Sequence, residues 1–329
     1  MKTSTFLFAL LMLFSMQISA TVFTVNNTPG SNAQYDNVQA AHDAASPGDT
    51  ILVSGSATQY NGVSVNKKIV IIGPGFKPSN NDNLVANINF ISLTSPNAEG
   101  STFIGVKSNE IGNDTGGLYI NFIQINRCEF SNIRGSGYAK NWTIENTIAL
   151  GLQGLELSTV RNSFLGIATN IKSSGLISNN FLGGSQPISG ENLLITNNIF
   201  FRTGSIRTNT SILNNNLFYE IQGSGEIVIP NLSFPVSNSF SENLEGLDPK
   251  FQNTSFGNTF RFQNDYNLQP DSPAKGAGTD GRDLGVYGGQ GFSNTGEPPL
   301  PIVTDLLIKN STLDKNGQLQ VEIKGRANN

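Results

Sequence analysis

The chain has 329 residues, of which only 13% are charged, and it contains 42 asparagines and 35 glycines. Average globular chains are about 25% charged, and Asn and Gly both disfavour helices and tolerate left-handed backbone at turns. The composition therefore predicts short strands and tight turns and excludes a helical bundle. A net charge of −4 gives no basic field for nucleic acid, and one cysteine with one histidine cannot build a thiolate or imidazole zinc site.

Residues 1–20 have the pattern of a secretory signal peptide. Lys2 supplies the positive charge, Phe6 to Phe14 form an apolar run, and Ala20 is the small residue at the expected cleavage site. The run is too short to span a bilayer, which takes about 20 apolar residues. We therefore expect no membrane span and a mature chain that is secreted or belongs to the cell envelope. An uncleaved interfacial anchor is the alternative.

One helix is predicted, over residues 37–45, because Val38, Ala41, Ala44 and Ala45 are spaced to cover one face. Pro47-Gly48-Asp49 ends it. From Thr50 onward the pattern changes to short runs of β-branched residues, which are typical of strands.

The middle of the chain carries an internal repeat of the form apolar, any, Asn, any, apolar. The central residues, at intervals of 16, 17, 18 and 18, are Asn146, Asn162, Asn179, Asn197 and Asn215, with Cys128 in the Asn place one copy earlier and Asn238 one copy later. This period is too short for a helix pair and fits one coil of a parallel β-solenoid. We expect both apolar residues to point inward and the asparagines to form a structural ladder at a bend, with amides bonded from coil to coil.

Several further segments resemble secreted bacterial right-handed parallel β-helix proteins, the pectate-lyase-like superfamily. The opening resembles theirs in Tyr35–Ala41, Ala45–Ile51 and Lys68–Gly73, and the end is similar in Asp248–Phe251, Asp265–Ala274 and Asp283–Gly289. The resemblance implies an all-β fold, a single-stranded right-handed parallel β-helix over residues 21–292, with the helix as its N-terminal cap. The superfamily includes lyases, hydrolases, epimerases and non-enzymatic surface proteins, so no activity follows from it.

The end of the chain differs from the repeat. Residues 293–303 contain Gly296-Glu297-Pro298-Pro299-Leu300-Pro301, which predicts a stiff linker. Residues 304–329 predict a short C-terminal β-hairpin appendage, with strands at 304–309 and 318–324 joined around Asn316-Gly317. An isolated hairpin is marginally stable, so it packs on the solenoid or begins a sorting module.

Candidate catalytic residues are few. The polygalacturonase-like hydrolases of the superfamily pair several Asp residues with a His, whereas this chain has only His42, on the predicted helix. What remains is a column one residue before the ladder: Arg127, Glu145 and Arg161. These residues form a cationic site for an acidic sugar, with Arg as the base, or a solvated ion-pair row. The pattern favours the ion-pair row.

Two other groups of charged residues are weaker candidates. Glu156, Lys172 and Arg207 each lie ten residues after a ladder Asn and could share a binding site. Asp280 and Asp283, with Asp271 nearby, could supply oxygens to Ca²⁺, although Gly281 and the terminal position favour turn capping instead. We predict no other metal and no cofactor.

Two hypotheses for function remain at this point. The first is a non-catalytic protein of the cell envelope or exterior that binds a polysaccharide, a cell-surface glycan or another surface. The alternative is a polysaccharide lyase-like enzyme that acts on acidic glycan through Arg or Lys. Because a stacked cluster of acids or cations is only weakly visible, the sequence favours the first.

Overall fold

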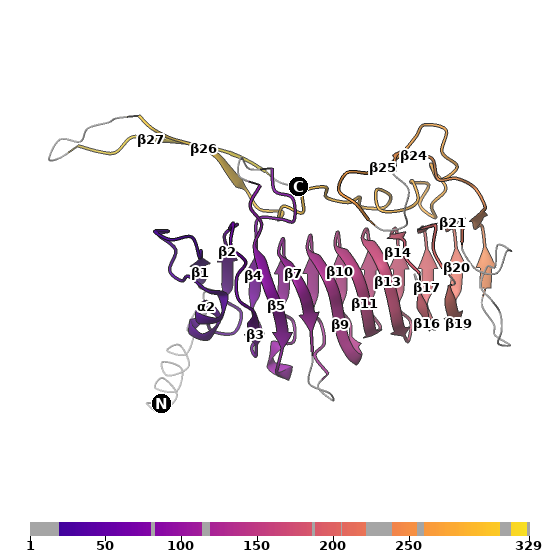
Figure 1. Cartoon of the computed structure of the whole chain (residues 1–329), viewed down its shortest axis with the longest axis horizontal. Helices are drawn as coiled ribbons and strands as arrows, with labels where there is room; N and C mark the ends of the chain where they lie inside the picture. Colours follow the sequence, from indigo (N-terminus) through magenta and orange to yellow (C-terminus); the bar gives the residue numbers. More distant parts are fainter. Residues whose placement is uncertain are drawn as a thin grey trace, which may run out of the picture.

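The computed structural model describes residues 20–79, 83–113, 119–185, 188–204, 206–221, 239–254, 260–309 and 317–327. Within them the chain forms the predicted right-handed parallel β-helix (Figure 1). Sheet A has 11 strands in the order β1 (Val22–Val25), β2 (Thr50–Val53), β4 (Val70–Ile72), β6 (Thr102–Ile104), β8 (Gln124–Asn126), β10 (Thr143–Glu145), β12 (Thr159–Arg161), β14 (Leu176–Ser178), β17 (Leu194–Thr196), β20 (Ile212–Asn214) and β22 (Ser239–Ser241).

Sheet B faces sheet A across the core. Its strands are β3 (Val63–Val65), β5 (Asn87–Leu93), β7 (Lys107–Gly112), β9 (Glu129–Lys140), β11 (Ile148–Glu156), β13 (Phe164–Lys172), β15 (Phe181–Leu182), β18 (Ile199–Phe201), β21 (Leu217–Tyr219) and β23 (Leu244–Glu245), with β16 (Ser189–Glu191) and β19 (Arg207–Asn209) beside them. All of these strands pair in parallel, so each coil of the chain lies directly on the one before it.

The interior is a continuous apolar column. In the three-residue strands of sheet A from β4 to β20 the central side chain points inward and is buried, as the two-residue period of a strand requires. In the last strand, β22, Phe240 is 37% exposed. Ile144 is paired with Val160, and Ile177 with Ile195, and each of these four is fully buried. The first apolar residue of the repeat therefore faces inward, as predicted.

The second apolar residue of the repeat does not face inward, and that part of the prediction is wrong. These residues lie on the outer side of sheet B in a second apolar cluster, where the C-terminal part of the chain covers them: Ile148, Phe164, Phe181, Ile199 and Leu217. The left-handed residue at the bend turns the chain, so the two apolar positions end on opposite sides of the wall.

The five ladder asparagines lie in one file at the bend that follows sheet A. They are Asn146, Asn162, Asn179, Asn197 and Asn215, and their φ angles lie between 46° and 60°. The residue before each of them is paired with the corresponding residue of the next strand of sheet A. Asn adopts this left-handed backbone at lower cost than other non-glycine residues.

The amides that bond from coil to coil belong to the following residue, so the predicted ladder is wrong by one position. Asn180 Nδ2 donates to Asn198 Oδ1 at 3.0 Å, and Asn198 Nδ2 donates to Asn216 Oδ1 at 2.9 Å. All three side chains are fully buried. In the preceding coils the hydroxyls of Thr147 and Ser163 occupy this inward position.

The two outer members of the predicted ladder need correction. Strand pairing aligns Glu145 with Asn126, so Arg127, with φ of 57°, stands in line with Asn146, and Cys128 takes the inward position. Asn238 lies outside the described residues. In its coil, Ser241 pairs with Asn214, so Glu242, with φ of 54°, occupies the bend.

Residues 274–297, which we call the strap, run back along the file of bends, in the orange and yellow part of Figure 1. Four of the five ladder asparagines form hydrogen bonds with the strap and not with one another. In sequence order of the strap, Ala277 O accepts from Asn215, Thr279 exchanges two bonds with Asn197, Val286 O and Gly288 O accept from Asn162, and Ser293 N donates to Asn146. The strap therefore spans several coils and runs along the stack from its C-terminal coils towards its N-terminal coils.

Helix α2 (Val38–Ala44) lies at the N-terminal end of the stack and packs on β1, β2 and β3. Asn37 caps it, because its Oδ1 accepts from Ala40 N at 2.7 Å. Val38, Ala41 and Ala45 join the core as predicted, whereas Ala44 is exposed. His42 is fully buried, and burial lowers its pKa. A 3₁₀ turn, η1 (Pro96–Ala98), precedes β6.

The C-terminal part contains two antiparallel pairs, β24 (Phe251–Asn253) with β25 (Asp265–Leu268), and β26 (Ile302–Ile308) with β27 (Val321–Arg326). The predicted turn residue Asn316 lies outside the described residues. The stretch predicted as a linker begins in contact with the solenoid, since Glu297 is only 5% exposed and accepts from Ser79 N.

No helix among the described residues is long and apolar enough to cross a membrane. The predicted signal peptide falls almost entirely in residues 1–19, outside the described residues.

Candidate functional site

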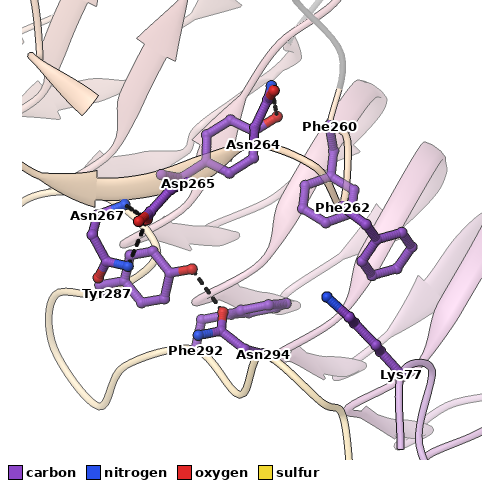
Figure 2. A pocket seen from close by; sticks show the side chains of 10 residues that line it. Lys77, Phe260, Phe262, Asn264, Asp265, Asn267, Tyr287, Phe292 and Asn294 are labelled. Atoms are coloured by element: carbon purple, nitrogen blue, oxygen red, sulfur yellow. Dashed lines mark hydrogen bonds between the residues drawn. The ribbon is translucent and has the colours of Figure 1, made fainter. Parts of the chain in front are cut away.

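A pocket of about 250 Å³ opens between the strap, the segment around β25 and the loop after β4 (Figure 2). Half of its lining is aromatic: Phe260, Phe262, Tyr266, Tyr287 and Phe292. The other half is polar: Lys77, Asn264, Asp265, Asn267 and Asn294. None of these residues belongs to the repeat, so the pocket exists only because the C-terminal part returns onto the solenoid.

The aromatic wall is fixed to the solenoid through Phe164. The Phe164 ring centroid lies 4.3 Å from that of Phe260 and 4.9 Å from that of Phe292. Phe260 in turn stacks on Tyr266 at 5.7 Å, with 22° between the ring planes. Aromatic pairs at these separations stabilise one another beyond simple burial. The outward apolar residues of the repeat thus hold the rings of the pocket in place.

The polar groups of the pocket are oriented by one another. Asp265 Oδ1 accepts from the backbone N and the Nδ2 of Asn267, at 2.9 and 2.7 Å. The Tyr287 hydroxyl donates to Asn294 Oδ1 at 2.7 Å, as Figure 2 shows. Lys77 Nζ lies 5.9 Å from the centroid of the Phe262 ring. The pocket therefore presents one carboxylate, one ammonium and several amides around apolar rings.

The two phenols are held in their neutral form. Burial, with a smaller contribution from the charge of Asp265, raises the pKa of Tyr287 to about 12. Burial also raises the pKa of Tyr266. At neutral pH both hydroxyls therefore act as hydrogen-bonding groups. A ligand with an apolar face and a polar edge matches this arrangement of rings and polar groups.

The predicted charged column is only partly a column. Glu145 and Arg161 are strand partners and form an ion pair at 2.6 Å, with the Arg161 side chain 35% exposed. Arg127 is not in line with them, because it stands at the bend, where its Nη1 donates to Glu297 O at 2.6 Å. Its place in the column is taken by Asn126. The Arg-Glu-Arg arrangement predicted from the sequence is therefore wrong.

The second predicted set is also only partly together. Glu156 and Lys172 are strand partners on sheet B, and Glu156 also lies 3.5 Å from Lys140. Arg207 pairs with Ser189, two residues before Glu191, which is the residue that faces Lys172 at 3.9 Å. The connection that follows Asn179 is longer by two residues, so Glu191, and not Ser189, lies opposite Lys172 in this coil. The row is thus Lys140, Glu156, Lys172 and Glu191, without Arg207.

The three aspartates proposed for Ca²⁺ each contact a cation. Asp271 accepts from Lys250 Nζ at 2.6 Å and Asp283 from Lys275 Nζ at 3.0 Å. Asp280 lies 3.8 Å from Arg282 and accepts from its backbone N. Over the part of the chain that the structure describes, no three His, Cys, Asp or Glu side chains gather in one place. Turn capping and ion pairing account for these carboxylates.

Cys128 is fully buried, and burial raises the pKa of its thiol to about 12. Since the thiolate is the reactive form, we expect the native protein not to react with a thiol reagent at mildly alkaline pH, and the protein unfolded in guanidinium to react fully. Spectrophotometric thiol titration measures both. Rapid labelling of the native protein would contradict the inward position of Cys128.

The pocket itself was not predicted from the sequence. Periodicity finds residues that recur, and the lining residues stand in segments that occur once. A sequence signal did exist, because Phe260, Phe262 and Tyr266 stand at even spacings among polar residues in the segment that follows the repeat. Without knowing where this segment packs, that alternation reads only as strand and turn.

Comparison with known proteins adds a similarity to solved structures. No protein-family model and no curated protein matches the chain. Among solved structures, it is similar to the pectin methylesterase from Aspergillus niger in deglycosylated form, with a TM-score of 0.36 and 12% identity over 74% of this chain and 92% of that chain. The fold therefore rests on the strand pairing described above, and the function on the residues of the site.

Proposed function

We propose that this protein is a non-catalytic, extracytoplasmic glycan-binding protein, and that the aromatic pocket under the strap is its binding site. The observation that carries the proposal is the lining of the pocket, in which five aromatic rings meet three amides, one carboxylate and one ammonium. Sugars carry C–H groups on their faces and hydroxyls at their edges, so they pair with rings and polar groups together. Ligand pockets commonly combine apolar walls with a few oriented polar groups.

The contacts of the charged residues that were considered for lyase chemistry support the non-catalytic hypothesis over the lyase alternative. Glu145 with Arg161 and Glu156 with Lys140 form partly exposed ion pairs on the outer surface. Such pairs contribute about 0–1 kcal/mol each and are common on solvated sheets. Arg127 is occupied by the strap, which it holds through Glu297 O. These contacts give each residue a structural role.

The experiment is a glycan array followed by calorimetric titration of the glycans retained. We expect the wild-type protein to bind and Phe262→Ala to bind about tenfold more weakly, because one ring–sugar contact of about 1–1.5 kcal/mol is lost. Phe90→Ala is the matched control, since Phe90 is 44% exposed on β5, outside the pocket lining. Retention of no glycan by the wild type would refute the proposal.

The same glycans also test the lyase alternative. Cleavage by a lyase leaves unsaturated sugar ends that absorb ultraviolet light. We expect no such absorbance from uronate polymers incubated with the protein. Absorbance that disappears in Arg161→Ala would overturn the non-catalytic proposal.

A further inference from the structure

The pocket is built from segments that occur once in the chain, not from the repeating surface of the coils. A solenoid that binds a linear polymer along its length repeats the same contacts from coil to coil, about 4.8 Å apart. The pocket instead combines Lys77 from one loop, residues 260–267 around β25, and residues 287–294 of the strap. No other coil offers an equivalent of these segments among the described residues. The geometry therefore fits one unit of a glycan.

The size of the pocket leads to the same conclusion. Pockets for drug-sized ligands hold about 300–1,000 Å³, and this one holds about 250 Å³. The walls are closely packed rings, with Phe262 centred 4.9 Å from Phe260 and Tyr287 centred 6.3 Å from Phe292. A ligand of one ring fits this space, and the rest of a chain would extend into solvent.

The charges of the lining sum to zero. Lys77 and Asp265 are the charged residues that line the pocket, within a protein whose net charge is −4. Among the described residues both bonds to the Asp265 carboxylate go to Oδ1, from Asn267. Its Oδ2 is thus available to accept from ligand hydroxyls. A ligand carboxylate placed beside Asp265 would be repelled, whereas neutral hydroxyls use Asp265 as acceptor and Lys77 as donor.

We infer that the pocket takes the terminal ring of a neutral glycan, with hydroxyls on Asp265 and the ring face on the aromatic wall. This inference rests on the proposed function and specifies its ligand class. It makes Asp265, which the repeat pattern of the sequence did not identify, the acceptor for the ligand hydroxyls.

The test is titration calorimetry with methyl glycosides of neutral hexoses, the corresponding uronic acids, and neutral oligosaccharides. We expect a neutral glycoside to bind within a few-fold of the oligosaccharide that ends in it, and the uronic acid to bind at least tenfold more weakly. Asp265→Asn should weaken binding of the neutral glycoside about tenfold, because a charge-assisted hydrogen bond is lost. The amide retains an acceptor for Asn267, so the local fold is kept.

Asp36→Asn, which changes an exposed aspartate before α2, is the control, and thermal melts compare the folding of the variants. Uronic acids that bind as tightly as neutral glycosides, an Asp265→Asn variant that binds normally, or binding confined to long polymers would each overturn this inference while the proposed function stands. Binding of no sugar at all would overturn both.

Discussion

Replacing Asn198 by Ala is expected to lower the free energy of unfolding by about 3–5 kcal/mol. Asn198 Nδ2 donates to Ile177 O and Thr196 O, and its Oδ1 accepts from Asn180 N at 2.9 Å. The alanine leaves the Asn180 N–H buried without a partner, and it removes the bonds that the Asn198 amide donates to Ile177 O, Thr196 O and Asn216 Oδ1. Each such buried group costs about 1–3 kcal/mol. Urea unfolding followed by circular dichroism measures the loss.

Two other asparagines of the same region serve as comparisons. Asn209→Ala removes an exposed side chain and should change stability by less than about 0.5 kcal/mol. Asn197→Ala removes the two hydrogen bonds to Thr279 of the strap and should fall between the two. If Asn198→Ala were no more harmful than Asn209→Ala, the inward amide ladder would be refuted.

The fold follows from the sequence because the repeat period is a direct measure of the coil length. The position of the ladder does not follow, because three successive coils contain an Asn-Asn pair. Asn179-Asn180, Asn197-Asn198 and Asn215-Asn216 have the same spacing whichever member is counted. Only the strand register shows that the first Asn of each pair forms the bend and the second bonds along the stack.

The site is harder to predict for a related reason. Apolar residues after the bend look the same in sequence whether they face the interior or a covering segment. Phe164 and Phe251 are 87 residues apart along the chain, yet both belong to the second apolar cluster. The strap, which adds Leu284 and Val286 to the same cluster, carries no repeat of its own. The strap is attached through the side-chain amides of the asparagines at the bends. The spacing of these asparagines in the sequence indicates a solenoid, but it does not indicate that another segment covers it.

Replacing Phe164 by Ala is expected to cost about 3–5 kcal/mol, the range for loss of a buried phenylalanine. Phe164 is 1% exposed, and its ring contacts Phe181, Tyr266 and Phe292 at centroid distances of 5.4, 4.9 and 4.9 Å. Since these contacts lie outside the solenoid interior, the loss of stability should affect residues 260–292, which cover the outer side of sheet B. Coils that contact only their neighbours can keep their own stability when a cover loosens.

Hydrogen exchange measured by mass spectrometry distinguishes the two parts of the molecule. In Phe164→Ala, amides of residues 260–292 should exchange faster, while strands β10 and β12 of sheet A keep their protection. Ile167→Ala is the matched control, because Ile167 lies on the same strand and is 37% exposed. Glycan affinity should fall together with the protection of residues 260–292, since the pocket loses the ring on which Phe260 and Phe292 rest. Equal loss of protection in sheet A would show instead that the strap and the solenoid unfold as one unit.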